Sequence, residues 1–449
     1  MVSESTPPRR PVLTLDDLAR PLTRRPERLH ALTSAELAIA FSQGLDLAEG
    51  KLAGHAQRVC YVAASIADAV GLDAVQRSAV FYAALLHDIG VTPAASDLCR
   101  AAGIDEDAIF GPSPLRGRDE PRRDPFVAES DLVEEALVGH CTLGAEVGER
   151  LDLGEGVGAA IAAHHEQWGG EGFPSGLVGE AIPIEARIVA VADIAESLIA
   201  QEISSLVARR HFPESIGQYA GTQLDPELVG IVLGLGRSDE FWLGLYAEDM
   251  AGTLMSMKAP GDARKSRKRV MRFAEVFADL SDAKGHQTVG HSRVTADGTQ
   301  KLAEAMGLDP GHVEMIRIAA LLHDVGLLGV PARIMSKPDI LSVTEMQLMR
   351  QHPANSELIL QDLPGFEEVA IWIARHHERP DGKGYPEMLA GDDIPLESRI
   401  LAIADVYAAL TSERPHRGAM RDHDAKQVLV GAAGTQLDPE LVRTFAGLL

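Results

Sequence analysis

The chain has 449 residues, of which 45% are hydrophobic and 24% charged, a composition typical of globular domains. Its formal net charge of -24 argues against binding of a nucleic-acid polymer, because phosphate-binding surfaces need a positive potential. A small anionic substrate would therefore need a local cationic site, such as bound metal ions.

Cysteine content and hydropathy indicate in which cellular compartment the protein is expected. The three cysteines, Cys60, Cys99 and Cys141, make no disulfide framework, which suits a reducing environment. The sequence contains no run of about 18 apolar residues, so no transmembrane helix is predicted. The first residues, MVSESTPPRRPVLTLDD, lack the apolar core of a signal peptide. We therefore expect a cytoplasmic protein with no membrane partner.

Helical patterns dominate the chain. Residues 1–30 carry several Pro and Arg without periodicity, and we interpret them as a flexible N-terminal arm. TSAE at 33–36 and SVTE at 342–345 are capping boxes, which predict helix starts. VQRSAVFYAALLHDIG (75–90) and VEMIRIAALLHDVG (313–326) predict apolar helices that end at Gly. Since convincing strand patterns are rare, the predicted fold class is all-α.

The sequence contains an internal repeat. The nine residues GTQLDPELV occur at 221–229 and again at 434–442. Further matched pairs are AALLHDIG with AALLHDVG, HHEQWGGEGFP with HHERPDGKGYP, and IPIEARIVAVADIAESL with IPLESRILAIADVYAAL. The histidines of these segments keep the same spacing in both copies, except for one interval that is longer in the first copy. The extra length falls on the Gly- and Pro-rich segment 98–130, which we interpret as an insertion.

We therefore predict two tandem copies of one helical domain. The first and more divergent copy spans 31–245 and contains the insertion. The polar, basic stretch 246–270 is interpreted as a linker, and the second copy spans 271–449.

Histidines and aspartates recur at matched positions. Ten of the 16 histidines lie at repeated positions, and each copy adds two aspartates. A lone histidine on an apolar helix is usually a core residue, but so many buried polar groups would be costly without a shared purpose. Metal ligation provides that purpose. The candidate ligands are His55, His87, Asp88, His140, His164, His165 and Asp193 in the first copy, and His291, His323, Asp324, His352, His376, His377 and Asp405 in the second.

Imidazole and carboxylate ligands suit divalent transition-metal ions, with Fe or Mn expected first and Zn, Ni or Co as alternatives. Each ligand set is too large for one ion with an open position and fits two ions joined by a bridging carboxylate. The expectation is thus two ions per copy, or about four per chain. Two ions about 3.5–4 Å apart suit hydrolysis of a phosphate ester, because they activate water and neutralise phosphate oxygens.

The motifs AALLHDVG, QHP, HHERPDGKGYP and IPLESRILAIADVYAALTSERPHR resemble the HD-GYP domain, a subset of the metal-dependent HD phosphohydrolases. The resemblance is close over 271–449 and looser over 31–245. It implies hydrolysis of a cyclic dinucleotide, with cyclic di-GMP, cut to pGpG or GMP, expected ahead of cyclic GMP-AMP.

The resemblance also implies roles for single residues of the second copy. Asp324, next to His323, would bridge the two ions. Arg414 and Arg417 match basic positions that the family uses on substrate phosphates. Tyr385 belongs to the GKGYP loop, which shapes the substrate mouth.

The chain departs from the family pattern at several positions. The usual Lys after the HD pair is replaced by Leu327 in the second copy and Val91 in the first. A second Asp after the last ligand is replaced by Ala408 and Glu196, respectively. Without this Lys, a positive charge near the substrate phosphate is absent, and this absence affects the expected turnover rate.

Two further differences concern metal number and phosphate binding. Where some members carry a third-metal Glu, the first copy has Lys51 and the second Gln287, which favours two-metal sites. At the positions of the two phosphate-binding arginines, the first copy has Glu202 and Ser205. A glutamate there would repel a phosphate.

The leading hypothesis is a bacterial cyclic dinucleotide phosphodiesterase whose second copy is the main catalytic site. One alternative is a sensing module that holds metal and nucleotide without efficient turnover and reports to a signalling protein. A broader HD-type nucleotide phosphohydrolase is the other. A homodimer is compatible with each of these hypotheses.

Overall fold

A computed structural model describes residues 32–48, 50–51, 53–92, 131–257, 266–284, 290–337, 339–412 and 418–449. Within these ranges the chain is helical, and its extended structure is limited to isolated bridges. The predicted all-α fold class is confirmed. The predicted arm at 1–30 and the insertion at 98–130 lie outside the described residues.

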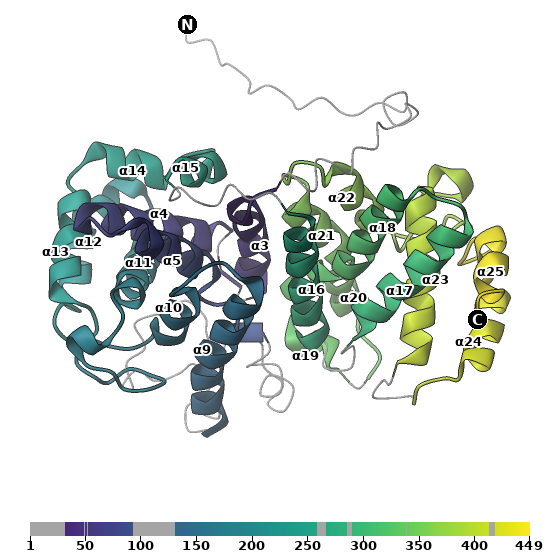
Figure 1. The fold of residues 1–449 in the computed structure, drawn as a ribbon, viewed down its shortest axis with the longest axis horizontal. Coiled ribbons are helices and arrows are strands. Elements are labelled where there is room, and N and C mark those ends of the chain that lie inside the picture. Colours follow the sequence, from purple (N-terminus) through teal and green to yellow (C-terminus); the bar gives the residue numbers. More distant parts are fainter. Residues whose placement is uncertain are drawn as a thin grey trace, which may run out of the picture.

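The helices form two lobes that lie side by side (Figure 1). The lobe of the first copy contains α3 (Ser34–Ala48), α4 (His55–Val70), α5 (Ala74–Leu86), α9 (Asp131–Leu151), α10 (Val157–Ala163), η1 (Gly179–Ala181), α11 (Ile184–Ala200), α12 (Ser205–Gly217), α13 (Pro226–Leu235), α14 (Asp239–Leu245) and α15 (Met250–Met257). The lobe of the second copy contains α16 (Arg267–Lys284), α17 (His291–Ala305), α18 (Pro310–Leu322), η2 (Val325–Gly329), α19 (Ala332–Met335), α20 (Val343–Met349), α21 (His352–Leu360), α22 (Glu367–Ala374), η3 (Gly391–Asp393), α23 (Leu396–Thr411), α24 (Asp422–Ala432) and α25 (Pro439–Ala446).

The segment interpreted as a linker, 246–270, contains helix α15 and the start of α16. Helix α15 packs against α4 and α3, so this part of the segment belongs to the first lobe. The domain boundaries themselves stay a prediction.

Both predicted capping boxes are confirmed. The Thr33 hydroxyl accepts a hydrogen bond from the Glu36 amide at 3.2 Å, and the Glu36 carboxylate accepts one from the Thr33 amide at 2.7 Å. Ser342 and Glu345 make the same reciprocal pair at the start of α20. These bonds satisfy amides that the helix itself leaves unpaired, which fixes where each helix begins.

The two copies meet through α3 and α16, which lie next to each other between the lobes (Figure 1). Phe41 on α3 and Phe277 on α16 occupy equivalent positions in the two copies, and their rings stack with centroids 4.2 Å apart. Helix α3 also packs against η2 and α21 of the second copy, while α16 packs against α9 of the first. Because equivalent elements exchange contacts, the interface resembles that of a two-fold symmetric dimer.

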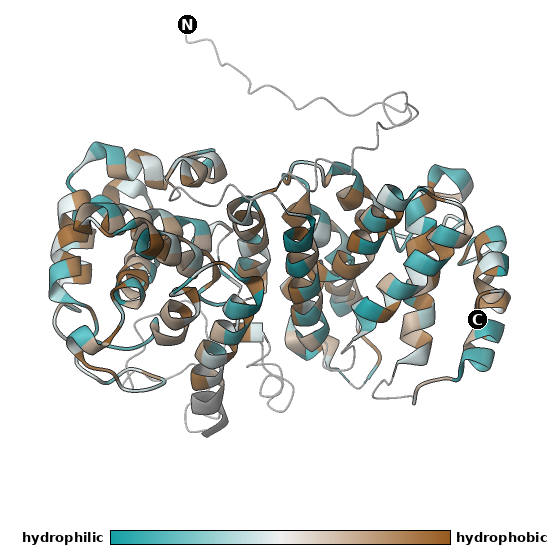
Figure 2. Ribbon diagram, viewed as in Figure 1, coloured by the Kyte–Doolittle hydropathy of each residue, from teal (hydrophilic) through white to brown (hydrophobic). Residues whose placement is uncertain are grey.

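One hydrophobic core runs through both copies. Brown apolar and teal polar residues occur together on helices of both lobes in Figure 2. The buried residues of α3 and α16 join the core of the first copy to that of the second without interruption. The repeat therefore folds as two joined lobes that share buried apolar surface.

The nine-residue repeat GTQLDPELV has a structural role in each copy. Asp225 and Asp438 cap helices α13 and α25 by accepting hydrogen bonds from amides of the first turn. The same carboxylates pair with Arg187 on α11 at 2.7 Å and Arg399 on α23 at 2.8 Å. The repeat therefore fixes α13 and α25 to the helices that carry the last predicted ligand of each copy, α11 and α23.

The shared core leads to a prediction about stability. Phe277 is fully buried, so Phe277→Ala should lower the free energy of unfolding by about 3–5 kcal/mol, as expected for an aromatic side chain removed from a core. Ile340→Ala is the matched control, because Ile340 is 94% exposed. Urea unfolding followed by circular dichroism measures both. Equal midpoints for the two variants would contradict a stabilising contact between the copies.

Candidate metal centres

Helix ends bring the predicted ligands of each copy together. Of the second copy's ligands, His291 opens α17 after Gly290, whose φ of +81° makes a sharp entry into the helix. His323 and Asp324 follow the last residue of α18, and His352 opens α21. The remaining histidines follow α22, and Asp405 lies within α23. The first copy places its ligands in corresponding positions on α4, α5, α9, α10 and α11, except that His140 lies within α9 and does not open it.

Asp324 is the centre of the site in the second copy. One carboxylate oxygen, Oδ2, lies 3.3 Å from His323 Nε2 and 3.9 Å from His291 Nε2. The other, Oδ1, lies 3.3 Å from His352 Nε2 and 4.0 Å from His376 Nε2. A single carboxylate thus faces two separate groups of imidazoles, which is the arrangement expected of a bridging ligand.

Backbone carbonyls orient the imidazoles. The Nδ1 atoms of His323, His352 and His376 lie 2.6–2.8 Å from carbonyl oxygens of the preceding helical turn. A hydrogen bond from Nδ1–H to a carbonyl leaves Nε2 as the basic atom, directed toward the carboxylate. In their neutral form the rings therefore have the tautomer and direction that metal ligation requires.

Asp88 has the same place in the first copy. Its Oδ2 lies 2.9 Å from His87 Nε2, and its Oδ1 lies 3.8 Å from His164 Nε2 and 4.0 Å from His140 Nε2. Asp193 on α11 faces the first group through His55, with 3.4 Å between Oδ1 and Nε2. The structure therefore brings together the predicted ligands of both copies.

The donor sets fit divalent metal ions. The ligand atoms form close groups: His55, His87 and Asp88; Asp88, His140, His164 and His165; His291, His323 and Asp324; His352, His376 and His377. Among the described residues, the buried Nε2 atoms of His164 and His323 have no hydrogen-bond partner, although each faces the central aspartate. Coordination of a cation would satisfy such buried nitrogens.

The local charges favour ionised aspartates. Burial alone would raise the pKa of Asp324, but the surrounding histidines, with His323 first, hold it below the ordinary value. Burial and the neighbouring His352 lower the pKa of His377 to about 4, so this ring is neutral near pH 7. Burial also lowers the pKa of His323, but the carboxylates of Asp324 and Asp405 outweigh it and raise the pKa to about 9.

An aromatic loop lies beside each site. Tyr385 of the GKGYP loop packs against His377 with ring centroids 4.8 Å apart, and Phe173 packs against His165 in the first copy at 4.9 Å, both pairs with tilted rings. The guanidinium of Arg350 lies 5.2 Å from the centroid of the Tyr385 ring. Sequence reasoning did not single out Arg350, because a polar residue at the end of a short helix resembles any solvated position.

The glutamate that follows each histidine pair was also missed. Glu378 is buried, and its two carboxylate oxygens accept hydrogen bonds from the amides of Glu387 at 2.6 Å and Leu389 at 2.9 Å. Glu166 holds the corresponding loop of the first copy in the same way. The signal was available, since HHE occurs in both copies ahead of each glycine-rich loop.

Other predicted positions have different outcomes. Arg414 and Arg417 lie outside the described residues. Leu327 is buried in a small apolar cluster with Val330, so its position adds no charge to the site. Glu202 pairs with His211 of α12 at 2.9 Å between Oε1 and Nδ1.

None of the described helices has the length and apolarity to cross a membrane.

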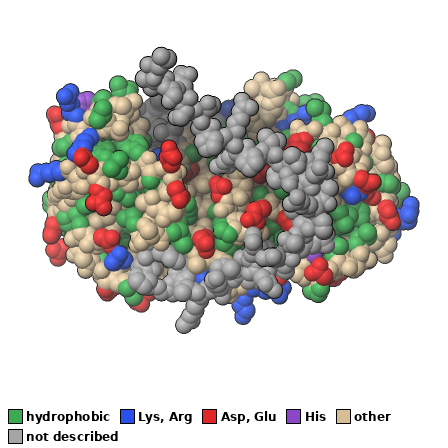
Figure 3. Space-filling model, turned by 90° about the horizontal axis from the view of Figure 1, so that it is seen from above, with side chains coloured by type: hydrophobic (Ala, Val, Ile, Leu, Met, Phe, Trp, Pro, Cys, Tyr) green, Lys and Arg blue, Asp and Glu red, His purple; other side chains and the backbone are tan. Residues whose placement is uncertain are grey.

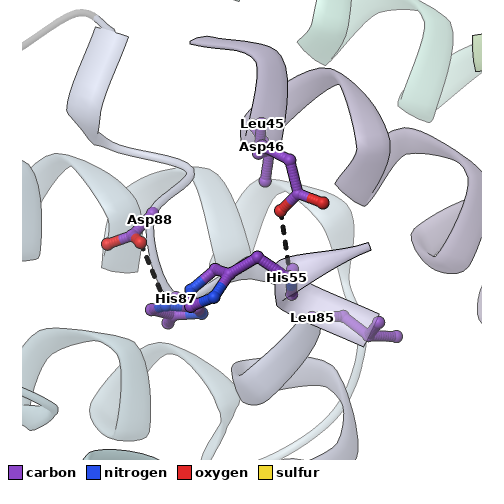
Figure 4. Close-up of a pocket in the computed structure, with 7 residues that line it drawn as sticks. Leu45, Asp46, His55, Leu85, His87 and Asp88 are labelled. Atoms are coloured by element: carbon purple, nitrogen blue, oxygen red, sulfur yellow. Dashed lines mark hydrogen bonds and ion pairs between the residues drawn. The ribbon is translucent and has the colours of Figure 1, made fainter. Parts of the chain in front are cut away.

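The first site differs from the second through Lys51. Its ammonium lies 2.6 Å from Asp88 Oδ2 and 3.1 Å from His55 Nε2. Figure 4 shows His55, His87 and Asp88 around the hollow beneath α3, with Asp88 directed toward His87. The first copy therefore has a resident cation among its predicted ligands.

A family model described as "HD domain" matches residues 128–228 and 271–441. The chain belongs to the HD domain family. The predicted relationship to the HD phosphohydrolases is thereby confirmed, with one matched segment in each copy.

Relatives include the 3'3'-cGAMP-specific phosphodiesterase 3 of Vibrio cholerae, 30% identical over 434 residues that cover 90% of this chain and 92% of the relative. The cyclic di-GMP phosphodiesterase response regulator RpfG of Xanthomonas campestris is 43% identical over 143 residues, or 31% of this chain and 38% of that one. A crystal structure of a cyclic GMP-AMP specific phosphodiesterase from V. cholerae aligns with a TM-score of 0.65 and 27% identity, covering 92% of this chain and 97% of that chain.

The raised pKa of His323 predicts pH-dependent metal binding by the second HD domain. Below pH 9 this ring holds a proton that a metal ion must displace, so affinity should fall about tenfold per pH unit as the pH decreases. Mn(II) titration by calorimetry in buffers of different ionisation enthalpy measures both affinity and proton release. An Asp88→Ala background limits the signal of the first copy. Affinity that is constant across this range would contradict the assignment of His323 as a ligand.

Proposed function

We propose that this protein is a metal-dependent phosphodiesterase that hydrolyses a cyclic dinucleotide in its second HD domain. The supporting observation is the position of Asp324, whose two oxygens face two separate groups of imidazoles. Such a carboxylate can hold two ions side by side. Two ions held in this way supply Lewis acidity toward a phosphate ester and activation of water.

The chain itself would position the substrate. Arg350 offers paired N–H donors that match the geometry of a phosphate, and it lies over the ring of Tyr385 at the edge of the site. The Tyr385 ring, in turn, is fixed against His377. Glu378 keeps the loop of this tyrosine closed through two backbone amides, so the loop does not rely on substrate for its shape.

The charges near the two sites favour the second as the catalytic one. The positions of Arg350 and Lys383 in the second copy correspond to Val138 and Glu171 in the first. A phosphate would meet cations at one mouth and an acid at the other. A local cationic site matters here, because the chain has a formal net charge of -24 and acidic side chains are scattered over the face of both lobes that Figure 3 shows.

Substrate identity rests on the relatives. The cyclic di-GMP relative matches 31% of this chain, whereas the 3'3'-cGAMP-specific relative matches 90%, across both copies. We therefore propose 3'3'-cGAMP as the first substrate to test. Cyclic di-GMP, the expectation from the sequence motifs alone, is the second candidate.

The assignment of the catalytic copy predicts unequal effects of matched variants. His323→Ala with Asp324→Ala should abolish hydrolysis, because it removes the bridging carboxylate and one imidazole. His87→Ala with Asp88→Ala removes the same groups from the first copy and should leave most of the activity. Steady-state kinetics with Mn(II) and 3'3'-cGAMP compares the two double variants. If the first-copy variant is the inactive one, the roles of the two domains are reversed.

Substrate choice is a separate prediction. With Mn(II) or Fe(II) present, kcat/KM for 3'3'-cGAMP should exceed kcat/KM for cyclic di-GMP, with chromatographic separation of linear products as the measurement. The reverse order would favour cyclic di-GMP. Metal loading without turnover of either compound would contradict the phosphodiesterase proposal and favour a sensing module.

A further inference from the structure

Lys51 lies where one of two metal ions would be expected in the first HD domain. Its ammonium is 2.6 Å from Asp88 Oδ2 and 3.1 Å from His55 Nε2. Together with His87, these two residues form one of the ligand groups of that domain. The lysine therefore already contacts ligand atoms that an ion in this group would need.

The chain holds Lys51 in this position. Its backbone amide donates to the carbonyl of Asp46 at 3.0 Å, which ties the segment after α3 to that helix. Its side chain is only 15% exposed. An ammonium that leaves the site would lose its contact with the buried Asp88 carboxylate, which favours the observed position.

The partner of Lys51, His55, is fixed from its other side. His55 Nδ1 lies 2.5 Å from Glu196 Oε2, and the other oxygen of Glu196 accepts a hydrogen bond from Arg58 Nε at 2.6 Å. These contacts connect the Lys51 ammonium, through His55 and Glu196, to the guanidinium of Arg58. The first domain thus pairs the buried carboxylates of Asp88 and Glu196 with its own basic side chains.

The second HD domain lacks this arrangement in the residues that the structure describes. There, the ion-pair partners of Asp324 and Asp405 are all histidines. His291 Nδ1 is buried without a hydrogen-bond partner, and Ala408 occupies the position of Glu196. Metal ions would therefore be the cations that balance the second site.

We propose that the first HD domain binds a single metal ion, in the group formed by Asp88, His140, His164 and His165, and that the Lys51 ammonium takes the place of the other ion. A metal ion bonds to imidazole nitrogen and carboxylate oxygen at about 2.0–2.2 Å. At that distance from His55 Nε2 and Asp88 Oδ2, it would overlap with the ammonium and repel its charge. The chain then holds about three ions in place of the four expected from ligand spacing.

A lysine differs from an ion in what it can do. The ammonium is a positive charge that a chelator cannot remove. A substrate oxygen cannot coordinate to it as it would to a metal ion. The first domain would keep the buried aspartate balanced and its fold intact, while losing the paired ions that hydrolysis uses. This inference concerns metal content alone, and it holds whichever substrate the second domain takes.

Metal content of the full-length chain tests the proposal. After anaerobic reconstitution with Mn(II) and desalting, elemental analysis should give about three ions per chain for the wild type and about four for Lys51→Gln. The control Lys301→Gln removes the same charge from an exposed position on α17 and should leave about three. About four ions in the wild type, or no gain in Lys51→Gln, would overturn the proposal.

Electron paramagnetic resonance gives a second readout that does not depend on counting. In a background with Asp324→Ala and His376→Ala, which breaks both ligand groups of the second domain, the Mn(II) of the first domain should show the resolved hyperfine signal of an isolated ion. Adding Lys51→Gln should replace it with the broadened signal of a coupled pair. A coupled signal before the lysine is changed, or an isolated one afterwards, would contradict the proposal. Circular dichroism of each variant establishes that it is folded before its metal is measured.

Discussion

Each half of this molecule depends on a buried carboxylate that two groups of imidazoles share. The side chains of Asp88 and Asp324 are only 9% and 15% exposed, so water cannot balance their charge. The surrounding chain must supply positive charge or ligands for it. This requirement explains why ends of several helices converge on one point, and why spacing between the ligand-bearing segments is kept while the intervening chain varies.

Much of the site was predictable because ligand geometry leaves a trace in the sequence. The histidines that face Asp324 recur at matched positions, as do Asp324 and Asp405, and an all-α fold follows from helical periodicity around them. The interface between the copies left no such trace. Phe41 and Phe277 have the pattern of ordinary core residues, and only the packing of α3 against α16 shows that they meet.

Charged side chains were harder to predict, since their role depends on where a long side chain points. Lys51 was interpreted by what the family places there, and its direction toward Asp88 emerges only from the fold. Glu378 and Arg350 resemble solvated residues in the sequence, yet one is buried under a loop and the other lies on Tyr385. Sequence position identifies the ligands, whereas side-chain direction decides the charge around them.

The reciprocal packing of α3 and α16 has a consequence for how the two sites can change. In a homodimer built on such an interface, every substitution appears twice, so a lysine that displaces an ion would impair both sites at once. Joining the copies in one chain removes that coupling. One lobe is then free to accumulate changes such as Lys51 and Glu196, provided that it keeps the apolar surface on which its neighbour rests. Selection on the first copy would then act mainly on its value as a scaffold.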